Sequence, residues 1–317
     1  MKPLENSIAL VAGATRGAGR GIARALGEAG ATVYCTGRSS RETATTRPET
    51  IEETAELVTA AGGRGIAVRT DHTVESEVVA LVERIRAESG RLDVLVNDIW
   101  GGDKLTQWRT PFWEVNIDDG RTLIDRAVMT HIITSRHAVP LMLASPPRET
   151  TPRLILEITD GSSWYYRGNL FYDLVKNAVI RLAYGMAWEL RRKGIAAVAV
   201  TPGFLRSEEM LENFGVSEAN WRDGAKVEPH FIASETPMFV GRAVAALAAD
   251  PNVGKKSGRV FSSWELSDEY GFVDEDGATP HWGRYWEQTF GEPLRKMDEA
   301  FYAYGDGVIE RVFQDWP

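Results

Sequence analysis

The feature that most constrains the fold is a regular alternation of short apolar runs with longer segments of helical periodicity. The runs, expected to be strands, cover residues 8–12, 32–36, 65–70, 92–97, 154–159, 196–201 and 259–262. The helical segments cover residues 19–29, 49–61, 75–89, 118–143, 171–193 and 237–249. The runs are too hydrophobic for a half-exposed sheet, which indicates helices on both faces. The pattern predicts an α/β fold with a doubly wound, parallel, seven-stranded sheet.

Three segments lie outside this alternation. Residues 100–117 and 204–236 are expected to be irregular insertions after the fourth and sixth strands. From residue 264 the pattern changes to an aromatic-rich tail without an evident core of its own. We therefore expect one catalytic domain, residues 1–263, and a C-terminal extension, residues 264–317, packed on that domain.

Charge and cysteine content narrow the possible functions. The chain has 36 Lys and Arg against 45 Asp and Glu, a formal net charge of −9, which disfavours nucleic acid and anionic membranes as partners. Cys35 is the single cysteine, so no intrachain disulfide can form, as is common in a reducing compartment. No signal peptide or membrane-length apolar run is evident. These features predict a soluble, cytoplasmic protein.

A glycine-rich turn follows the first expected strand. The sequence IALVAGATRGAGRGIARAL places Gly13, Gly17 and Gly19 between that strand and a helix. Glycines allow a tight turn and close approach to a pyrophosphate, and the helix N-terminus offers free N–H groups to phosphate oxygens. The turn predicts a dinucleotide site.

A second motif begins the helix after the fifth expected strand. Tyr172 and Lys176 form Y-x-x-x-K, a spacing that places both side chains on one helix face. A nearby ammonium favours the phenolate, which should bring the pKa of Tyr172 down towards a working range. Tyr172 could then exchange a proton with a carbonyl or alcohol oxygen.

Together, G-x-x-x-G-x-G, Y-x-x-x-K and the segment TPGF after the sixth strand resemble the short-chain dehydrogenase/reductase family, over about residues 5–263. The RHAVPLM segment is similar to the member-1 branch of its dehydrogenase/reductase subset. The resemblance implies a Rossmann-type fold, a homodimer or homotetramer, and Tyr172 and Lys176 as the catalytic pair. It implies cofactor contacts from Gly13, Gly17, Gly19, Asp71, Asn97, Lys176, Pro202, Gly203 and Ser207.

The choice of cofactor follows from charge. An NAD-selective site places an acid at the end of the second strand, but this sequence has Arg38 there and Arg16 beside Gly17. Two guanidinium groups can bind a 2′-phosphate through charge-assisted hydrogen bonds. The sequence predicts NADP(H).

Three positions depart from the family pattern. The usual Asn-Asn-Ala-Gly reads Asn97, Asp98, Ile99, Trp100. The position of the catalytic Ser holds Asp160. Three explanations remain open. Asp160 is protonated, or the hydroxyl of Thr159, Ser162 or Ser163 takes over the role of the serine, or the substrate has a group that needs an acceptor. The helical Asn of the family's proton relay falls near Ala127; His131 is a possible substitute, although a packed or surface histidine is the more common role.

Aromatic residues gather in the loops that follow the fourth and fifth strands. Ligands bind at this edge of open α/β sheets, so Trp100, Trp164 and Tyr166, with Phe204, are expected to line a pocket for a bulky, largely apolar substrate. Packing against the tail or a neighbouring subunit is the alternative. The five His and the scattered acids show no metal-binding spacing, so no metal is predicted.

Three functions remain open. The leading hypothesis is an NADP(H)-dependent oxidoreductase that interconverts a carbonyl and an alcohol, or a related C=N or C=C group, with Tyr172 as acid or base, Lys176 as its partner and Asp160 orienting the substrate. Asp160 and the absent Asn also suggest a non-redox lyase, dehydratase or cyclase. The third is a catalytically silent NADP-binding sensor or scaffold, which the intact Tyr172 and Lys176 disfavour.

Overall fold

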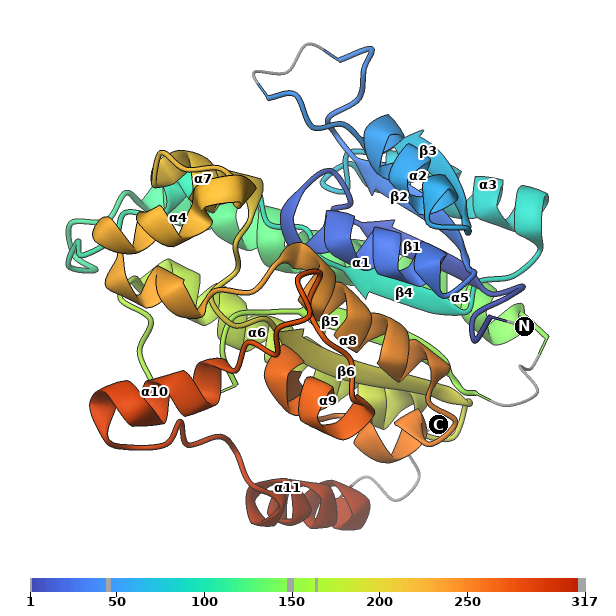
Figure 1. Cartoon of the computed structure of the whole chain (residues 1–317). Coiled ribbons are helices and arrows are strands. Elements are labelled where there is room, and N and C mark those ends of the chain that lie inside the picture. The colour runs from blue at the N-terminus through green and yellow to red at the C-terminus, as the bar shows by residue number, and fades with distance from the viewer. Residues whose placement is uncertain (1, 44–46, 147–150, 163–164, 313–317) are drawn as a thin grey trace.

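The computed structural model describes residues 2–43, 47–146, 151–162 and 165–312 (Figure 1), so Ser163 and Trp164 lie outside the described residues. Its centre is a parallel sheet with the strand order β3-β2-β1-β4-β5-β6-β7. The strands are β1 (Ile8–Ala12), β2 (Thr32–Gly37), β3 (Arg64–Arg69), β4 (Val94–Asn97), β5 (Arg153–Ile158), β6 (Ile195–Thr201) and β7 (Val260–Ser262). The predicted seven-stranded Rossmann-type sheet is confirmed.

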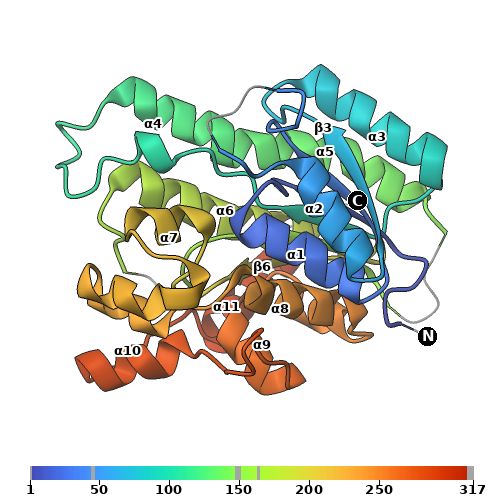
Figure 2. The ribbon, with the colours of Figure 1, turned by 45° about the horizontal axis from the view of Figure 1, so that its top comes forward.

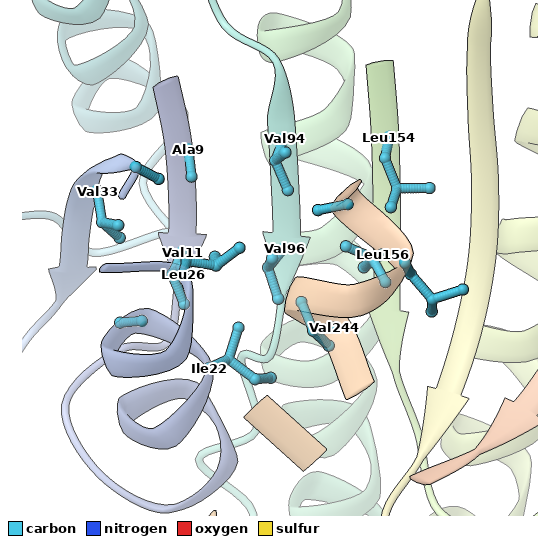
Figure 3. Close-up of a cluster of buried hydrophobic side chains, with 14 of the residues drawn as sticks. Ala9, Val11, Ile22, Leu26, Val33, Val94, Val96, Leu154, Leu156 and Val244 are labelled. Atoms are coloured by element: carbon cyan, nitrogen blue, oxygen red, sulfur yellow. The ribbon is translucent and has the colours of Figure 1, made fainter. Parts of the chain in front are cut away.

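Helices cover both faces of this sheet. One face carries α1 (Gly17–Glu28), α2 (Ile51–Ala60) and α8 (Pro237–Ala249), and the other carries α3 (Glu75–Ser89), α5 (Thr130–Ala144) and α6 (Leu170–Leu190). Figure 2 shows the two helical layers on opposite sides of the strands. Side chains alternate between the two faces along each strand. On β1, Val11 packs towards Ile22 of α1 (Figure 3), whereas Leu10 belongs to the core under α3 and α5.

The helix expected over residues 118–143 is interrupted in the structure. It consists of α4 (Ile117–Ile124), a π-helical turn over Asp125–Met129 and then α5. The backbone N–H of Thr130 donates to the carbonyl oxygen of Asp125, which widens the helix at this point. Such turns often occur at functional sites. Hydrophobic periodicity alone does not reveal the extra residue.

The prediction that residues 204–236 are irregular is wrong. This segment contains α7 (Glu208–Asn213) and 3₁₀ helices at Glu218–Lys226 and Pro229–Ala233. Ser207 caps α7 by accepting from the backbone N–H of Met210. Trp221 and Phe231 are buried, so the segment has a small apolar core that its polar sequence partly conceals.

The C-terminal extension forms three helices, α9 (Ser263–Tyr270), α10 (Trp282–Phe290) and α11 (Glu299–Val312). Leu266 of α9 is part of the main core, and Tyr302 of α11 is buried beneath the guanidinium of Arg259. In contrast, α10 has no buried residue and lies against the loops through aromatic contacts. Among the helices described, none has the length and apolarity needed to cross a membrane.

Candidate active site

A cavity of about 900 Å³ lies at the carboxyl ends of the central strands. At one end it is lined by the glycine turn after β1, and at the other by loops that follow β4, β5 and β6 and by part of the C-terminal extension. Crevices at this edge are the usual ligand sites of doubly wound sheets. The cavity brings together most of the residues that the sequence singled out.

The glycine turn forms the cofactor end of the cavity. Gly13 has φ +96°, and a Cβ atom there would lie 2.4 Å from the backbone oxygen of Asp98, so no larger residue fits. The backbone N–H of Gly17, at the start of α1, donates to Glu208 Oε2 at 2.8 Å. Glu208 of α7 therefore occupies a backbone N–H group at a helix N-terminus, the kind of position that binds phosphate groups.

The two arginines predicted to select NADP(H) both line the cavity. Arg16 Nη2 lies 3.4 Å from Asp103 Oδ2, a long and partly exposed ion pair. Arg38 follows β2, is exposed, and lies near Asp71, which also lines the cavity. No acid occupies the end of β2, the position at which an NAD-selective site carries one.

Tyr172 and Asp160 form the reactive centre at the other end. The phenolic O–H of Tyr172 donates to Asp160 Oδ2 at 2.6 Å. The main chain of Asp160 is held in turn by Arg167, whose Nε donates to its carbonyl oxygen at 2.7 Å. Asn169 caps α6 and accepts from the backbone N–H of Tyr172, which fixes where the helix begins. The side chain at the position of the family's serine is therefore a carboxyl group that accepts a hydrogen bond from the phenol.

Lys176 lies one helical turn beyond Tyr172 and is half-buried against aromatic rings. Its Nζ is 4.4 Å from the centroid of the Trp100 ring and 5.5 Å from that of Tyr172. Burial lowers the pKa of the Lys176 ammonium, and the carboxylates of Asp160 and Asp98 oppose that shift. The aromatic faces and nearby carboxylates together stabilise the positive charge.

The expected effect of Lys176 on Tyr172 is wrong in direction. Burial and the negative charge of Asp160, to which the phenol donates, raise the pKa of Tyr172 well above its usual value. The ammonium faces the rings, so it offsets little of this effect. Tyr172 is therefore a neutral phenol in this arrangement, so it carries the proton that a general acid needs and cannot act as a base in that state.

Asp98 is a half-buried acid that the sequence reasoning did not place in the site. Burial raises its pKa to about 7, while Lys176, His131 and a hydrogen bond from the Gly19 N–H act in the opposite direction. The side chain lines the cavity. The sequence signal for this residue is the replacement of the family's second Asn by an acid, but that replacement alone does not predict that its side chain lines the cavity.

The hydroxyl groups proposed as substitutes for the family's serine differ in their surroundings. The Thr159 hydroxyl donates to the carbonyl oxygen of Lys176 at 2.7 Å, so it is already engaged within the fold. Ser162 is buried and lines the cavity. Ser163 is outside the described residues.

Asn97 and His131 lie beneath the cavity rather than along it. The Asn97 amide donates to Ser135 Oγ and to Glu157 Oε1, and its side chain is fully buried. His131 is 1% exposed, with Nδ1 2.6 Å from Glu157 Oε2 and Nε2 donating to the Ile99 carbonyl oxygen. The predicted cofactor contact of the Asn97 side chain is therefore not supported by its position, and His131 has the packed role.

Aromatic side chains surround the substrate end. Trp100 and Trp108 contact the Tyr172 ring, at centroid distances of 5.2 and 4.8 Å. The remaining apolar walls come from Tyr165, Phe204, Trp264, Trp282 and Leu294. Tyr166 is 59% exposed and does not line the cavity, so the predicted residue is corrected to its neighbour Tyr165, which stacks on Trp286 of α10.

Pro202, Gly203 and Ser207, the residues expected near the nicotinamide, line the cavity between its two ends. Beneath them lies Glu235, a buried acid missed by the sequence reasoning. Its Oε2 accepts from the Gly203 N–H at 2.9 Å and from the Ser263 hydroxyl at 2.6 Å. Burial raises the pKa of this carboxyl to about 8.

Replacing Glu235 by glutamine should therefore make stability less sensitive to pH between about 4.5 and about 8. The folded state keeps the carboxyl proton up to about pH 8, whereas the unfolded chain releases it near 4.5, so the free energy of unfolding falls as the pH rises between these values. In that interval the wild type should lose about 1.4 kcal/mol per pH unit relative to Glu235→Gln, and the difference should level off above it. Urea unfolding at matched acidic and alkaline pH measures the difference, and parallel stability curves would contradict it.

Sequence comparison places the chain in a known class. A family model described as short chain dehydrogenase matches residues 7–217, and the chain belongs to this oxidoreductase family, whose fold binds a nicotinamide cofactor. The chain is 36% identical to mouse dehydrogenase/reductase SDR family member 1 over 280 residues, 87% of this chain and 85% of that protein. It is 34% identical to the human protein, over 87% of this chain and 85% of that one. The predicted family and its member-1-like branch are confirmed.

Solved structures show the same fold. A short chain dehydrogenase from Mycobacterium thermoresistibile has a TM-score of 0.72 and 21% identity, covering 88% of this chain and 92% of that one. A 3-oxoacyl-[acyl-carrier protein] reductase from Brucella melitensis, in complex with NAD, has a TM-score of 0.66 and 25% identity, covering 81% and 95%.

Proposed function

We propose that this protein is an NADP(H)-dependent oxidoreductase that interconverts a carbonyl and an alcohol, or a related unsaturated group, on a bulky and largely apolar small molecule. The observation that carries the proposal is one continuous cavity with the glycine turn at one end and Tyr172, Lys176 and Asp160 at the other. The cradle at Gly13 has no room for a Cβ atom, and α1 begins at its edge. These residues fit a dinucleotide.

The chain's own groups account for the acid–base part of the reaction. When bound, the nicotinamide supplies or accepts a hydride. In reduction, Tyr172 gives its phenolic proton to the substrate oxygen, for which it must exchange its hydrogen bond with Asp160. Lys176, whose Nζ lies 5.5 Å from the centroid of the ring, compensates part of the negative charge that remains on the phenolate. Asp160 then orients the phenol and the substrate.

Arg38 is the residue proposed to select the phosphorylated cofactor. Replacing it by alanine should weaken NADPH binding by about tenfold to a hundredfold, since a hydrogen bond to a charged group contributes about 1.5–3 kcal/mol. NADH binding should change little. Calorimetry with both cofactors measures the two affinities. Equal losses for NADPH and NADH would remove Arg38 from this role, and a wild type that binds neither would end the proposal.

Glu208 should compete with the cofactor for the N-terminus of α1. Its carboxylate accepts from the Gly17 N–H, so a pyrophosphate that binds there must displace it. Replacing Glu208 by glutamine should tighten NADPH binding about fivefold, because a charge near a helix end is worth about 1 kcal/mol. Glu212→Gln is the matched control, because Glu212 lies on the same helix as Glu208 but accepts a hydrogen bond from Arg47 instead of the Gly17 N–H. Weaker binding by Glu208→Gln would contradict this role.

The proposal also covers the oligomeric state of the protein and its location in the cell. The apolar side chains of Ile124, Met129, Ile132 and Leu174 are exposed on α4, α5, α6 and the π turn between them. They support a homodimer or homotetramer joined through these helices.

The site suits a small molecule as substrate. We propose a cytoplasmic location on the basis of the composition of the chain.

Turnover distinguishes this function from its rivals. The experiment follows NADPH absorbance with a panel of aryl and alicyclic ketones and aldehydes. Consumption of NADPH with formation of alcohol supports the proposal. Product formation without net NADPH consumption would instead support a lyase, dehydratase or cyclase, and tight cofactor binding without any product would support a sensor or scaffold.

A further inference from the structure

Asp160 gives the reaction centre a negative charge that carbonyl reduction does not need. Its Oδ2 accepts a hydrogen bond from the Tyr172 hydroxyl at 2.6 Å. Its charge adds to the effect of burial in raising the pKa of Tyr172, and it opposes the lowering of the Lys176 pKa by burial. A carboxylate in this position repels the negative charge that develops on a carbonyl oxygen as hydride arrives. It attracts a substrate that begins the reaction with a positive charge.

The aromatic walls favour the same kind of substrate. Trp100 and Trp108 both contact the phenol ring, with ring centroids 5.2 and 4.8 Å from that of Tyr172. The Trp100 ring already binds one cation, the ammonium of Lys176, at 4.4 Å. Indole faces attract cations because of their quadrupole, and more strongly where water is excluded.

Charged side chains line both ends of the cavity. Arg16 and Arg38 follow β1 and β2, at the dinucleotide end, and Arg16 is paired with Asp103. Towards the substrate end the lining includes two carboxylates, Asp160 and Glu228, and the ammonium of Lys176, which lies over the Trp100 ring. The substrate half therefore combines two carboxylates and aromatic rings with one ammonium.

We propose that the preferred substrates are bulky, apolar iminium ions, which the enzyme reduces to amines. This inference rests on the proposed hydride-transfer function and specifies its substrate class. The hydride and its electron pair bond to the iminium carbon, and the C=N π pair becomes the nitrogen lone pair. The iminium charge is neutralised as the nicotinamide becomes the cation, and no proton is required in this step. Tyr172 can keep its hydrogen bond to Asp160 throughout.

The test compares two substrates of similar shape and different charge. N-methyl-dihydroisoquinolinium is a permanent iminium ion, and α-tetralone is a neutral ketone with a related bicyclic skeleton. With NADPH, wild-type kcat/KM should be at least about tenfold higher for the iminium ion, a difference of about 1.4 kcal/mol. Asp160→Asn and Asp160→Ser should each reduce that ratio by about tenfold. Glu83→Gln, on the exposed face of α3, is the matched charge control and should keep the ratio.

Binding provides a measurement that does not depend on turnover. The ammonium form of N-methyl-tetrahydroisoquinoline should bind the wild type about tenfold more tightly than Asp160→Asn, measured by calorimetry without cofactor. Trp108→Leu, which keeps every charge, should weaken binding of the same amine severalfold, so the inference stays testable if an Asp160 variant does not fold.

The possible failures are distinguishable. A wild type that reduces α-tetralone as well as the iminium ion, or an unchanged ratio in folded Asp160→Asn, would overturn the iminium inference and leave the oxidoreductase intact. A wild type that consumes NADPH with neither substrate and binds no cofactor would overturn both.

Discussion

Replacing Tyr172 by phenylalanine should lower kcat for ketone reduction by about a thousandfold. General acid catalysis by a positioned side chain contributes about 10²–10⁴ in rate. The phenol is the proton donor we propose; it lines the cavity, and its hydrogen bond to Asp160 orients it. Stopped-flow or steady-state NADPH consumption with a reactive ketone measures the loss.

Tyr34→Phe is the matched control for this experiment. The Tyr34 hydroxyl bonds Glu88 and Ser89 in the core between β2 and α3, away from the cavity, so its loss should leave turnover unchanged. Turnover by Tyr172→Phe within about tenfold of the wild type would remove the phenol from the proton-transfer step.

Replacing Gly21 by alanine should destabilise the fold by about 3 kcal/mol, at the upper end of the usual cost of overpacking. Gly21 lies where α1 crosses α8, and a Cβ atom there would lie 2.0 Å from the backbone oxygen of Pro237. On the other helix, a Cβ at Gly241 would lie 2.5 Å from the Gly21 oxygen. Backbone atoms cannot rotate away, so the two helices must separate.

Gly185→Ala separates this steric effect from helix propensity. Gly185 lies within α6 with no atom within 4 Å of an added Cβ, so alanine there should stabilise the protein by about 0.5–1 kcal/mol. Denaturant unfolding of both variants gives the comparison. Equal and small effects at the two positions would contradict the close helix crossing.

The elements of the sheet were predictable because their signal is local. The strand at residues 8–12 and the helices at residues 75–89 and 237–249 begin and end as expected, because apolar runs and caps are read directly from sequence. The segment 204–236 was not, because its helices depend on a small core of Trp221 and Phe231 brought together by tertiary contacts.

In the site, positions were easier to predict than properties. Motif spacing correctly placed Tyr172, Lys176 and Asp160 along one cavity. It could not give the pKa direction of Tyr172, since that depends on which neighbour its hydroxyl faces and how deeply it is buried. Glu235 comes from a distant part of the chain and has no motif, so no sequence signal pointed to it.

The weak packing of α10 separates the shape of the cavity wall from the stability of the main domain. This helix contributes Trp282 to the substrate wall, yet it buries no residue of its own and contacts the loops through rings such as Tyr165 and Phe204. The sheet and the glycine turn do not depend on it for packing. Substitutions within residues 282–290 should therefore change the wall of the cavity while leaving the stability of the main domain nearly unaltered.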